Sequence, residues 1–344
     1  MVGTKTSCWK SLPEQRFSGR WPCARRRLTL ERLEDRTVLS TISLPVTSLA
    51  DTGVGTLRAA ITTADQGAAS NRYVIKFSVT LPATIDLKSA LPDLHNNITI
   101  KGPGASNLTV QRDSSAPDFS VFTVDGGETV TLSGMTIAGG NADRGGGIDN
   151  NGMTTISNSI FTDNSAGGGG GGLFNFGTIT ISSSSFIDNS ASEGSGGGLW
   201  NDGTMTISRS SFIGNSASSD GGLFNGGILT MNDSSFIDNS AVNDGGGLWN
   251  DRTMTISRSS FIGNSAALGG ALGNDRTMTV SGSSFIDNSA SVDGGGIDNN
   301  GTATVRGSIF IDNAAADGGG VYNIGTLINT RNLFFDNTGG DVSP

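Results

Sequence analysis

The sequence predicts an all-β fold, a right-handed parallel β-helix in which three short strands make up each turn of 24–26 residues. Two recurring landmarks support this prediction. The first is a Phe followed three residues later by Asn, at Phe161, Phe186, Phe212, Phe236, Phe261, Phe285, Phe310 and Phe334. The second is an Asn two residues after an aliphatic residue, at Asn150, Asn175, Asn201, Asn225, Asn250, Asn274, Asn299 and Asn323. Both series advance by 25, 26, 24, 25, 24, 25 and 24 residues, so each turn stacks in register on the last.

Each repeat contains three segments in which apolar and polar residues alternate, the pattern of a half-buried strand. In one turn these segments read GGGLWN, TMTIS and SSFI, and bends rich in Gly, Asn and Asp separate them. No segment is long and periodic enough for a helix. Stacked turns of a solenoid lie about 4.8 Å apart. We therefore expect the recurring Asn to form inward-facing ladders of hydrogen bonds between neighbouring turns.

The solenoid is predicted to begin irregularly, over residues 41–128, before the regular repeats of residues 129–344. The segment TLRAAITTA, residues 56–64, places Leu57, Ile61 and Ala64 on one helical face. We expect a short N-terminal helix there, which caps the open edge of the first turn. Strand-like runs follow at residues 73–79, 97–101, 108–111 and 121–124.

Residues 1–40 differ in charge from the rest of the chain. Of the 22 basic and 31 acidic residues, nine and four lie in this segment, which leaves 13 and 27 for the remainder, a net charge of −14. An acidic body repels phosphate backbones, so nucleic acid is not an expected partner. Both cysteines, Cys8 and Cys23, lie in the basic segment. No run of about 18 apolar residues occurs, so no transmembrane helix is expected.

Two parts of the chain resemble known proteins. The stretch RRLTLERLEDRTVLS, residues 26–40, resembles the export or sorting segment of planctomycete-type surface proteins. This likeness predicts that residues 1–40 are a disordered targeting segment outside the fold. The order GTLRAAITTAD, ITIKGPG and FTVDGGETVTLSGMTIAGG, followed by repeated FxxN and GG[IL]xN units, resembles polymorphic-outer-membrane-protein-type repeat proteins of the pectate-lyase-like superfamily. The resemblance implies an extracellular, cell-surface or outer-membrane protein of a bacterium. Because the chain stops just after its last repeat, we expect it to be exported or peripherally attached.

The same resemblance raises an enzymatic alternative, since the superfamily includes polysaccharide lyases and hydrolases. Such enzymes need clustered carboxylates with an Arg, Lys or His nearby. Residues 129–344 contain no Lys or His, and the lone His95 lies in the irregular start. Arg209 and Arg258 stand three residues before the repeat Phe, with Asp233 at the same place in the turn between them. This spacing predicts an Arg–Asp–Arg ladder on an outer face, so no catalytic residue is predicted.

An Asp directly precedes the Asn that follows the repeat Phe on most turns, at Asp163, Asp188, Asp238, Asp287, Asp312 and Asp336. A column of carboxylates would allow a Ca²⁺ site. Gly214 and Gly263 interrupt the column, however, and Asp is also a residue that favours turns. Turn formation is the preferred interpretation, and neither a metal site nor a cofactor is predicted.

One residue per turn, between an inward aliphatic residue and the ladder Asn, is predicted to point outward. This column reads Asp149, Phe174, Trp200, Phe224, Trp249, Gly273, Asp298 and Tyr322. Its four successive aromatic residues, Phe174, Trp200, Phe224 and Trp249, are the candidate ligand-binding site. Aromatic faces stack against the C–H surfaces of sugars, and exposed apolar rows mark interaction sites. Two alternatives remain: the rings stack on one another and stiffen the sheet, or they lie under the glycine-rich loops.

These features predict a non-enzymatic cell-surface or secreted protein that serves adhesion or glycan binding. Its expected partners are surface or matrix polysaccharides, or the surface of a host or neighbouring cell. The alternative is a polysaccharide lyase or hydrolase of the pectate-lyase-like superfamily. A cluster of acidic residues with Arg on one sheet would favour the enzyme, whereas isolated carboxylates along bends favour the binding protein.

Overall fold

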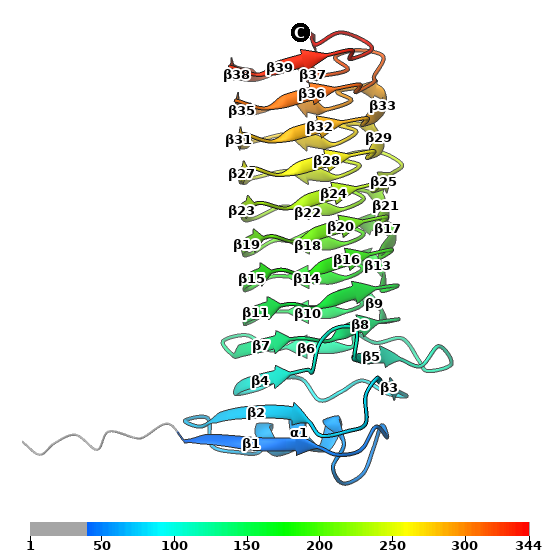
Figure 1. Cartoon of the computed structure of the whole chain (residues 1–344), viewed down its shortest axis with the longest axis vertical. Coiled ribbons are helices and arrows are strands. Elements are labelled where there is room, and N and C mark those ends of the chain that lie inside the picture. Colours follow the sequence, from blue (N-terminus) through cyan, green and yellow to red (C-terminus); the bar gives the residue numbers. More distant parts are fainter. Residues whose placement is uncertain (1–39, 344) are drawn as a thin grey trace, which may run out of the picture. The chain divides into compact units, whose positions relative to one another are not determined.

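The computed structural model describes residues 40–343 and confirms the predicted fold, a right-handed parallel β-helix (Figure 1). The chain divides after Val38 into two units, of which the second is the solenoid. The predicted export segment, residues 1–40, lies outside the described residues except for Ser40. Each strand pairs in parallel with the strand one turn before and one turn after it, so the strands form long sheets along the solenoid.

Two of these sheets carry most of the core. Sheet A has 12 strands: β1 (Thr41–Val46), β2 (Arg72–Phe77), β4 (Asn97–Lys101), β7 (Thr129–Ser133), β11 (Met153–Ser157), β15 (Thr178–Ser182), β19 (Thr204–Ser208), β23 (Ile228–Asn232), β27 (Thr253–Ser257), β31 (Thr277–Ser281), β35 (Thr302–Arg306) and β38 (Thr326–Thr330). Sheet B has 11 strands: β3 (Ala83–Leu87), β5 (Leu108–Arg112), β8 (Thr136–Ala138), β12 (Ile160–Thr162), β16 (Ser185–Ile187), β20 (Ser211–Ile213), β24 (Ser235–Ile237), β28 (Ser260–Ile262), β32 (Ser284–Ile286), β36 (Ile309–Ile311) and β39 (Leu333–Phe335).

Of the other two sheets, sheet D forms the side that is on the right in Figure 1, whereas sheet C overlaps sheet B in the middle of that view. Sheet C has 10 strands: β6 (Phe122–Val124), β10 (Ile148–Asn150), β14 (Leu173–Asn175), β18 (Leu199–Asn201), β22 (Leu223–Asn225), β26 (Leu248–Asn250), β30 (Leu272–Asn274), β34 (Ile297–Asn299), β37 (Val321–Asn323) and β40 (Val342–Ser343). Sheet D has seven: β9 (Asn141–Arg144), β13 (Ser165–Gly169), β17 (Ser190–Ser195), β21 (Ser216–Ser219), β25 (Ser240–Ala241), β29 (Ser265–Leu268) and β33 (Ser289–Asp293).

The prediction of three strands per turn is wrong for seven turns, because each of them has a fourth strand in sheet D. Most of its strands directly follow the Asn of the repeat Phe, for example Asn164 before β13, and consist largely of Ser, Ala and Gly. Their pattern contains at most one fully buried apolar residue, such as Ala166 in β13 or Ala191 in β17. The alternation that identifies a half-buried strand is therefore missing from this part of the repeat.

The core consists of columns in which residues of the same kind stack from turn to turn. The repeat Phe rings from Phe161 to Phe334 stack in one row, with neighbouring centroids 4.5–5.0 Å apart and ring planes within 3–11° of parallel. Both predicted Asn ladders are present, and all their residues except the last, Asn323 and Asn337, are buried. In the first, from Asn150 to Asn323, each Nδ2 donates to the Oδ1 of the next turn at 2.6–2.7 Å. In the second, from Asn164 to Asn337, the same bond measures 2.9–3.0 Å.

The predicted capping helix is also present, as α1 (Leu57–Asp65) at the N-terminal end of the solenoid (Figure 1). Thr56 caps it, because its hydroxyl accepts a hydrogen bond from the backbone N–H of Ala59 at 3.2 Å. The helix buries Leu57, Ile61 and Ala64 as expected, together with Ala60. These side chains join the same apolar core as the first turns, so the helix covers apolar surface that would otherwise face water.

Candidate functional site

The predicted aromatic column exists, but most of it is less exposed than expected. Phe174, Trp200, Phe224 and Trp249 pair in register on neighbouring strands of sheet C. Phe174 and Trp249 are only 6% and 8% exposed, and Trp200 and Phe224 are half-buried. The expectation of four openly displayed rings is therefore wrong. Carbohydrate binding by this column stays a prediction.

The chain itself covers these rings. A Cβ atom on Gly169, the last residue of β13, would lie 2.4 Å from Cε3 of Trp200. The Trp200 ring therefore lies directly against the backbone of sheet D. Its neighbours complete the packing, because the Trp200 ring centroid lies 5.5 Å from that of Phe174 and 4.5 Å from that of Phe224. Both alternatives to an exposed row thus have support: the rings contact one another, and a glycine-rich segment lies over them.

Further along the same column stands one acidic side chain, Asp298. Gly273 follows Trp249, and a Cβ atom there would lie 1.9 Å from Cε3 of the indole, so the ring lies across this glycine. Asp298 comes next in register and is 1% exposed. Burial, followed by the charges of Asp293, Asp275 and Asp244, raises the pKa of Asp298 to about 7.

A second feature is an open surface groove along the bend between sheets A and B. It crosses four successive turns, about 15 Å at the spacing of stacked strands, and is lined by Ser183, Ser184, Ser185, Arg209, Ser210, Ser211, Asp233, Ser234, Ser235, Arg258 and Ser260. We call it the serine groove. Two kinds of serine meet there. Buried ones such as Ser234 belong to an internal ladder, in which its N–H donates to the Ser259 hydroxyl at 3.3 Å. Half-buried ones such as Ser211 and Ser185 present hydroxyls on the outer face, 2.8 Å from each other.

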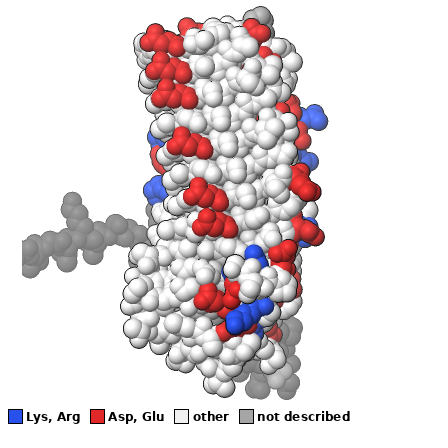
Figure 2. Space-filling model, turned by 90° about the vertical axis from the view of Figure 1, so that its right-hand side faces the viewer, with Lys and Arg blue, Asp and Glu red and all other residues white. Residues whose placement is uncertain are grey.

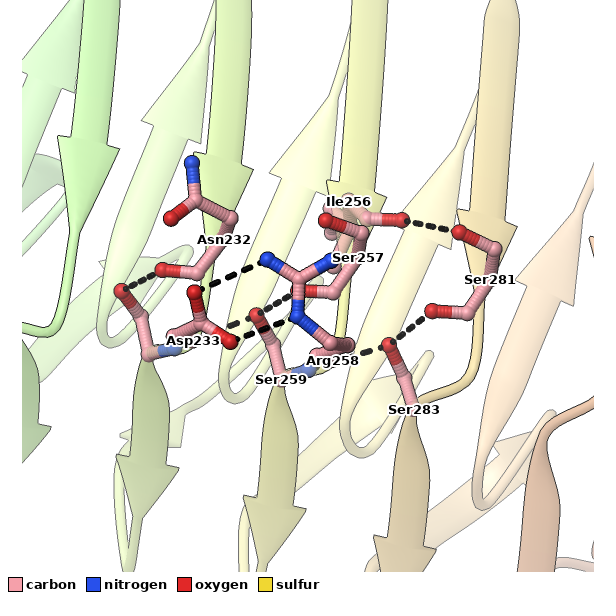
Figure 3. A network of polar contacts seen from close by, with 9 residues as sticks. Asn232, Asp233, Ile256, Ser257, Arg258, Ser259, Ser281 and Ser283 are labelled. Atoms are coloured by element: carbon pink, nitrogen blue, oxygen red, sulfur yellow. Dashed lines mark hydrogen bonds and ion pairs between the residues drawn. The ribbon is translucent and has the colours of Figure 1, made fainter.

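The predicted Arg–Asp–Arg ladder is half formed in this groove. Arg258 binds Asp233 through two hydrogen bonds, 2.7 Å from Nε to Oδ1 and 2.9 Å from Nη2 to Oδ2 (Figure 3). These bonds hold the pKa of Asp233 below its usual range. Arg209, on the other side of Asp233, forms no ion pair with any residue in the range 40–343. Its exposed guanidinium is therefore available to a ligand.

The backbone along this groove is unusual for the residues it carries. Ser183, Arg209, Asp233 and Arg258 occupy one column, and all have left-handed φ values of 47–50°. Other turns place glycine there, for example Gly282 with φ 58°. Glycine adopts this conformation without strain, whereas a residue with a Cβ atom does so at a cost of about 1–2 kcal/mol.

The Asp column before the second ladder Asn forms turns, as the preferred interpretation predicted. Asp163, Asp188, Asp238, Asp287, Asp312 and Asp336 all have φ values of 52–54°. Among residues 40–343, no three acidic, His or Cys side chains lie close enough together to hold a metal ion. His95 lies on the surface, with Nδ1 against the carboxylate of Asp125.

The serine groove is not evident as a surface from the sequence, although the residues that line it recur there. A pair of serines precedes the repeat Phe at 184–185, 210–211, 234–235, 259–260 and 283–284. One serine of each pair points inward and the other outward, which is the expected alternation of a strand. Nothing in the spacing indicated that the bend beside them is hollowed.

No protein-family model matches the sequence, and no curated protein matches it either. Two solved structures have a distant likeness to the chain. The ORF18 protein of Geobacillus virus E2 is 15% identical, with a TM-score of 0.33; the match covers 86% of this chain and 61% of the viral protein. The A-module of a mannuronan C-5 epimerase from Azotobacter vinelandii is 12% identical, with a TM-score of 0.39; that match covers 87% of this chain and 99% of the module. Within the described residues, no helix has the length and apolar character needed to span a bilayer.

Proposed function

We propose that the protein is a non-catalytic β-helix of the cell surface or extracellular space that binds polysaccharide in the serine groove. One observation carries this proposal: the groove crosses four turns and combines outward serine hydroxyls with the unpaired guanidinium of Arg209. A sugar chain presents hydroxyl groups along its length, and each can exchange hydrogen bonds with serine. Arg209 adds charge-assisted bonds, which are about twice as strong as neutral ones.

The left-handed bend of this groove accepts glycine in place of its charged side chains. Arg209 and Arg258 stand at positions where Gly282 serves another turn of the same solenoid without strain. The same left-handed conformation recurs at Arg331, outside the groove, so the strain belongs to the bend of the repeat. The groove keeps charged side chains at positions where glycine would give a more relaxed bend.

Replacement of arginine by glycine at this bend provides the test. Arg209→Gly is expected to keep or slightly raise stability, because relief of about 1–2 kcal/mol of backbone strain offsets the flexibility of glycine in the unfolded chain, about 0.5–1 kcal/mol. The same change is expected to weaken polysaccharide binding about tenfold or more, since it removes a charged hydrogen-bond donor. Affinity is measured on immobilised neutral and uronate-containing polysaccharides, and stability by thermal unfolding.

Arg331→Gly is the matched control. Arg331 has the same left-handed conformation, with φ 57°, but does not line the groove. The Arg331→Gly variant should show the same change in stability and should bind polysaccharide like the unchanged protein. Equal loss of binding in both variants, or no loss in Arg209→Gly, would refute the proposal. Release of unsaturated uronates from the same polysaccharides would instead favour the lyase alternative.

Export is the second part of the proposal and concerns residues 1–40, of which only Ser40 is described. Charge, cysteines and the motif LERLEDR all distinguish this segment from the solenoid. Deletion of residues 1–39 is expected to leave thermal unfolding nearly unchanged and to abolish delivery to the cell surface, measured by fractionation of the native host. A variant that reaches the surface, or that no longer folds, would contradict this assignment.

A further inference from the structure

The outer face of sheet A carries threonine at the same place on nine successive strands, from β4 to β35. These threonines are the middle residues of their strands and pair in register from turn to turn: Thr99, Thr131, Thr155, Thr180, Thr206, Thr230, Thr255, Thr279 and Thr304. A second column stands two residues before the first. It contains Thr129, Thr178, Thr204, Thr253, Thr277, Thr302 and Thr326, with Met153 and Ile228 on two turns. We call these two columns the threonine array.

The middle position of these strands is constant, although it faces outward. The residue after it is buried and differs between turns, as Ile207, Met231 and Val280 show. Outward positions ordinarily vary more than buried ones, since substitutions on the surface change stability little. Threonine favours strands, but so do Val, Ile and Tyr. Strand formation alone therefore does not account for an unbroken column of threonine.

The face that carries the array is also uncharged. On the seven strands from β7 to β31, the third outward position is Ser or Asn, and no outward residue is charged. The charges of these turns lie at the bends, for example Arg252 before β27 and Arg258 after it. Figure 2 shows the contrasting side of the solenoid, which is on the right in Figure 1 and carries rows of acidic side chains. An acidic protein thus keeps one long face free of charge.

The hydroxyls of the array are available to water. Within residues 40–343, Thr99 is the one member of the middle column whose hydroxyl has a protein partner, Nη2 of Arg72 at 3.4 Å. The middle threonines from Thr155 to Thr255 are exposed. A β-branched side chain is stiff at χ1, and backbone pairing fixes each strand against the next. The hydroxyl and methyl positions are therefore set before a ligand arrives, which lowers the entropy cost of binding.

The array repeats in two directions. Neighbouring turns place its threonines about 4.8 Å apart, and the two columns on one strand are about 6.6 Å apart. The middle column extends over about 38 Å at this spacing. A single polymer chain repeats in one direction only, so a crystal surface is the complementary partner. The oxygen atoms on a prism face of hexagonal ice form a rectangular lattice whose two repeats are close to these lengths.

We propose that the threonine array binds ice. Each hydroxyl offers one donor and two acceptor sites to water, and the methyl groups beside it restrict the orientation of the water molecules between the columns. Water held in this way occupies the positions of an ice layer and joins the crystal. The array contains no aromatic residue, so it lacks the ring faces that stack on sugars. This site is separate from the serine groove.

The test uses the full chain in a buffered solution that freezes slowly, because growing ice excludes a protein that has no affinity for it. The protein concentration is measured in the ice and in the remaining liquid. We expect the unchanged protein to be incorporated into the ice. The double variant Thr180→Lys/Thr230→Lys places two long charged side chains on the middle column, and we expect it to lose incorporation. Thr206→Lys, a smaller change to the same face, should also be incorporated less.

Ser192→Lys/Val242→Lys is the matched control. It adds the same charge to the same two turns, at exposed positions in and beside the strands of sheet D. This control should be incorporated like the unchanged protein, and thermal unfolding should show that all the variants are folded.

Three results would overturn the proposal. The first is exclusion of the unchanged protein from ice. The second is equal behaviour of the two folded double variants, which would mean that added charge alone decides incorporation. The third is retention on microcrystalline cellulose without incorporation into ice, which would make a crystalline polysaccharide the occupant. Arg209→Gly leaves the array intact and should be incorporated normally, so the outcome for the serine groove does not affect this test.

Discussion

At the scale of single residues, the buried carboxyl of Asp298 makes the stability of the fold depend on pH. Its pKa is raised from 3.8 to about 7, chiefly by burial. Between these values the folded chain holds a proton that the unfolded chain has already released. Stability must therefore fall as the pH rises from about 4 to about 7 and then level off. Asp220, also buried, shifts in the same direction.

Asp298→Asn is the corresponding prediction. Asn has the shape of the protonated carboxyl and cannot ionise, so the variant should lose most of this pH dependence. At pH 8 its free energy of unfolding should exceed that of the unchanged protein by about 1–3 kcal/mol. This range is set below the free energy that corresponds to the whole pKa shift. Urea unfolding at pH 5 and pH 8 measures the difference. An unchanged slope with pH would show that Asp298 titrates normally in the folded protein.

At the scale of elements, the strands are held together by ladders that run across them. Asn215 shows how many bonds one ladder residue makes. Its Oδ1 accepts from the N–H and the Nδ2 of Asn189, and its Nδ2 donates to Phe186 O and to Asn239 Oδ1. An apolar side chain at this position removes a partner from several buried groups on the two neighbouring turns, each at a cost of about 1–3 kcal/mol.

Asn215→Leu is therefore expected to destabilise the protein by about 3–5 kcal/mol, although Leu has nearly the same size. Asn337→Leu, at the half-exposed C-terminal end of the same ladder, should cost about 1 kcal/mol, since water replaces the lost bonds. Denaturant unfolding of both variants gives the comparison. Similar costs at the internal and the terminal position would mean that the ladder side chains contribute little beyond the backbone pairing of the strands.

How far the sequence predicts these elements depends on whether a column repeats. Phe212 and Asn215 recur every turn, so their burial, register and ladder were predictable. The alternating Thr204–Ser208 strand was predictable for the same reason. β17 was not, because its residues, SASEGS, carry no apolar alternation. That omission led to the wrong exposure for Trp200, whose ring lies against the end of the missed strand β13. The serine groove depends on a bend and on single unmatched residues, which the repeat period does not reveal.

At the scale of the whole molecule, the solenoid is a stack in which each turn contacts only its neighbours. Deletion of residues 226–250 removes one turn and joins Asn225 to Asp251, which keeps every ladder in register. We expect this variant to fold and to unfold within a few degrees of the unchanged protein. Deletion of residues 226–237 removes about half a turn and should abolish cooperative unfolding, because apolar columns then face polar ones. Circular dichroism during heating distinguishes the two outcomes, and collapse of the one-turn deletion would contradict a modular stack.

The shared ladders also bear on how such a gene changes over time. Because the upper edge of any regular turn fits the lower edge of any other, unequal recombination between repeats adds or removes whole turns while the product stays folded. Selection for folding then acts on the Phe and Asn columns, and the bends are free to diverge from copy to copy. Arg209 and Asp298 are departures of this kind, since their counterparts in the adjacent turns are Ser183 and Asp233 for the first, and Gly273 and Tyr322 for the second. In a chain built by duplication, the positions where the copies disagree are the first places to look for acquired binding.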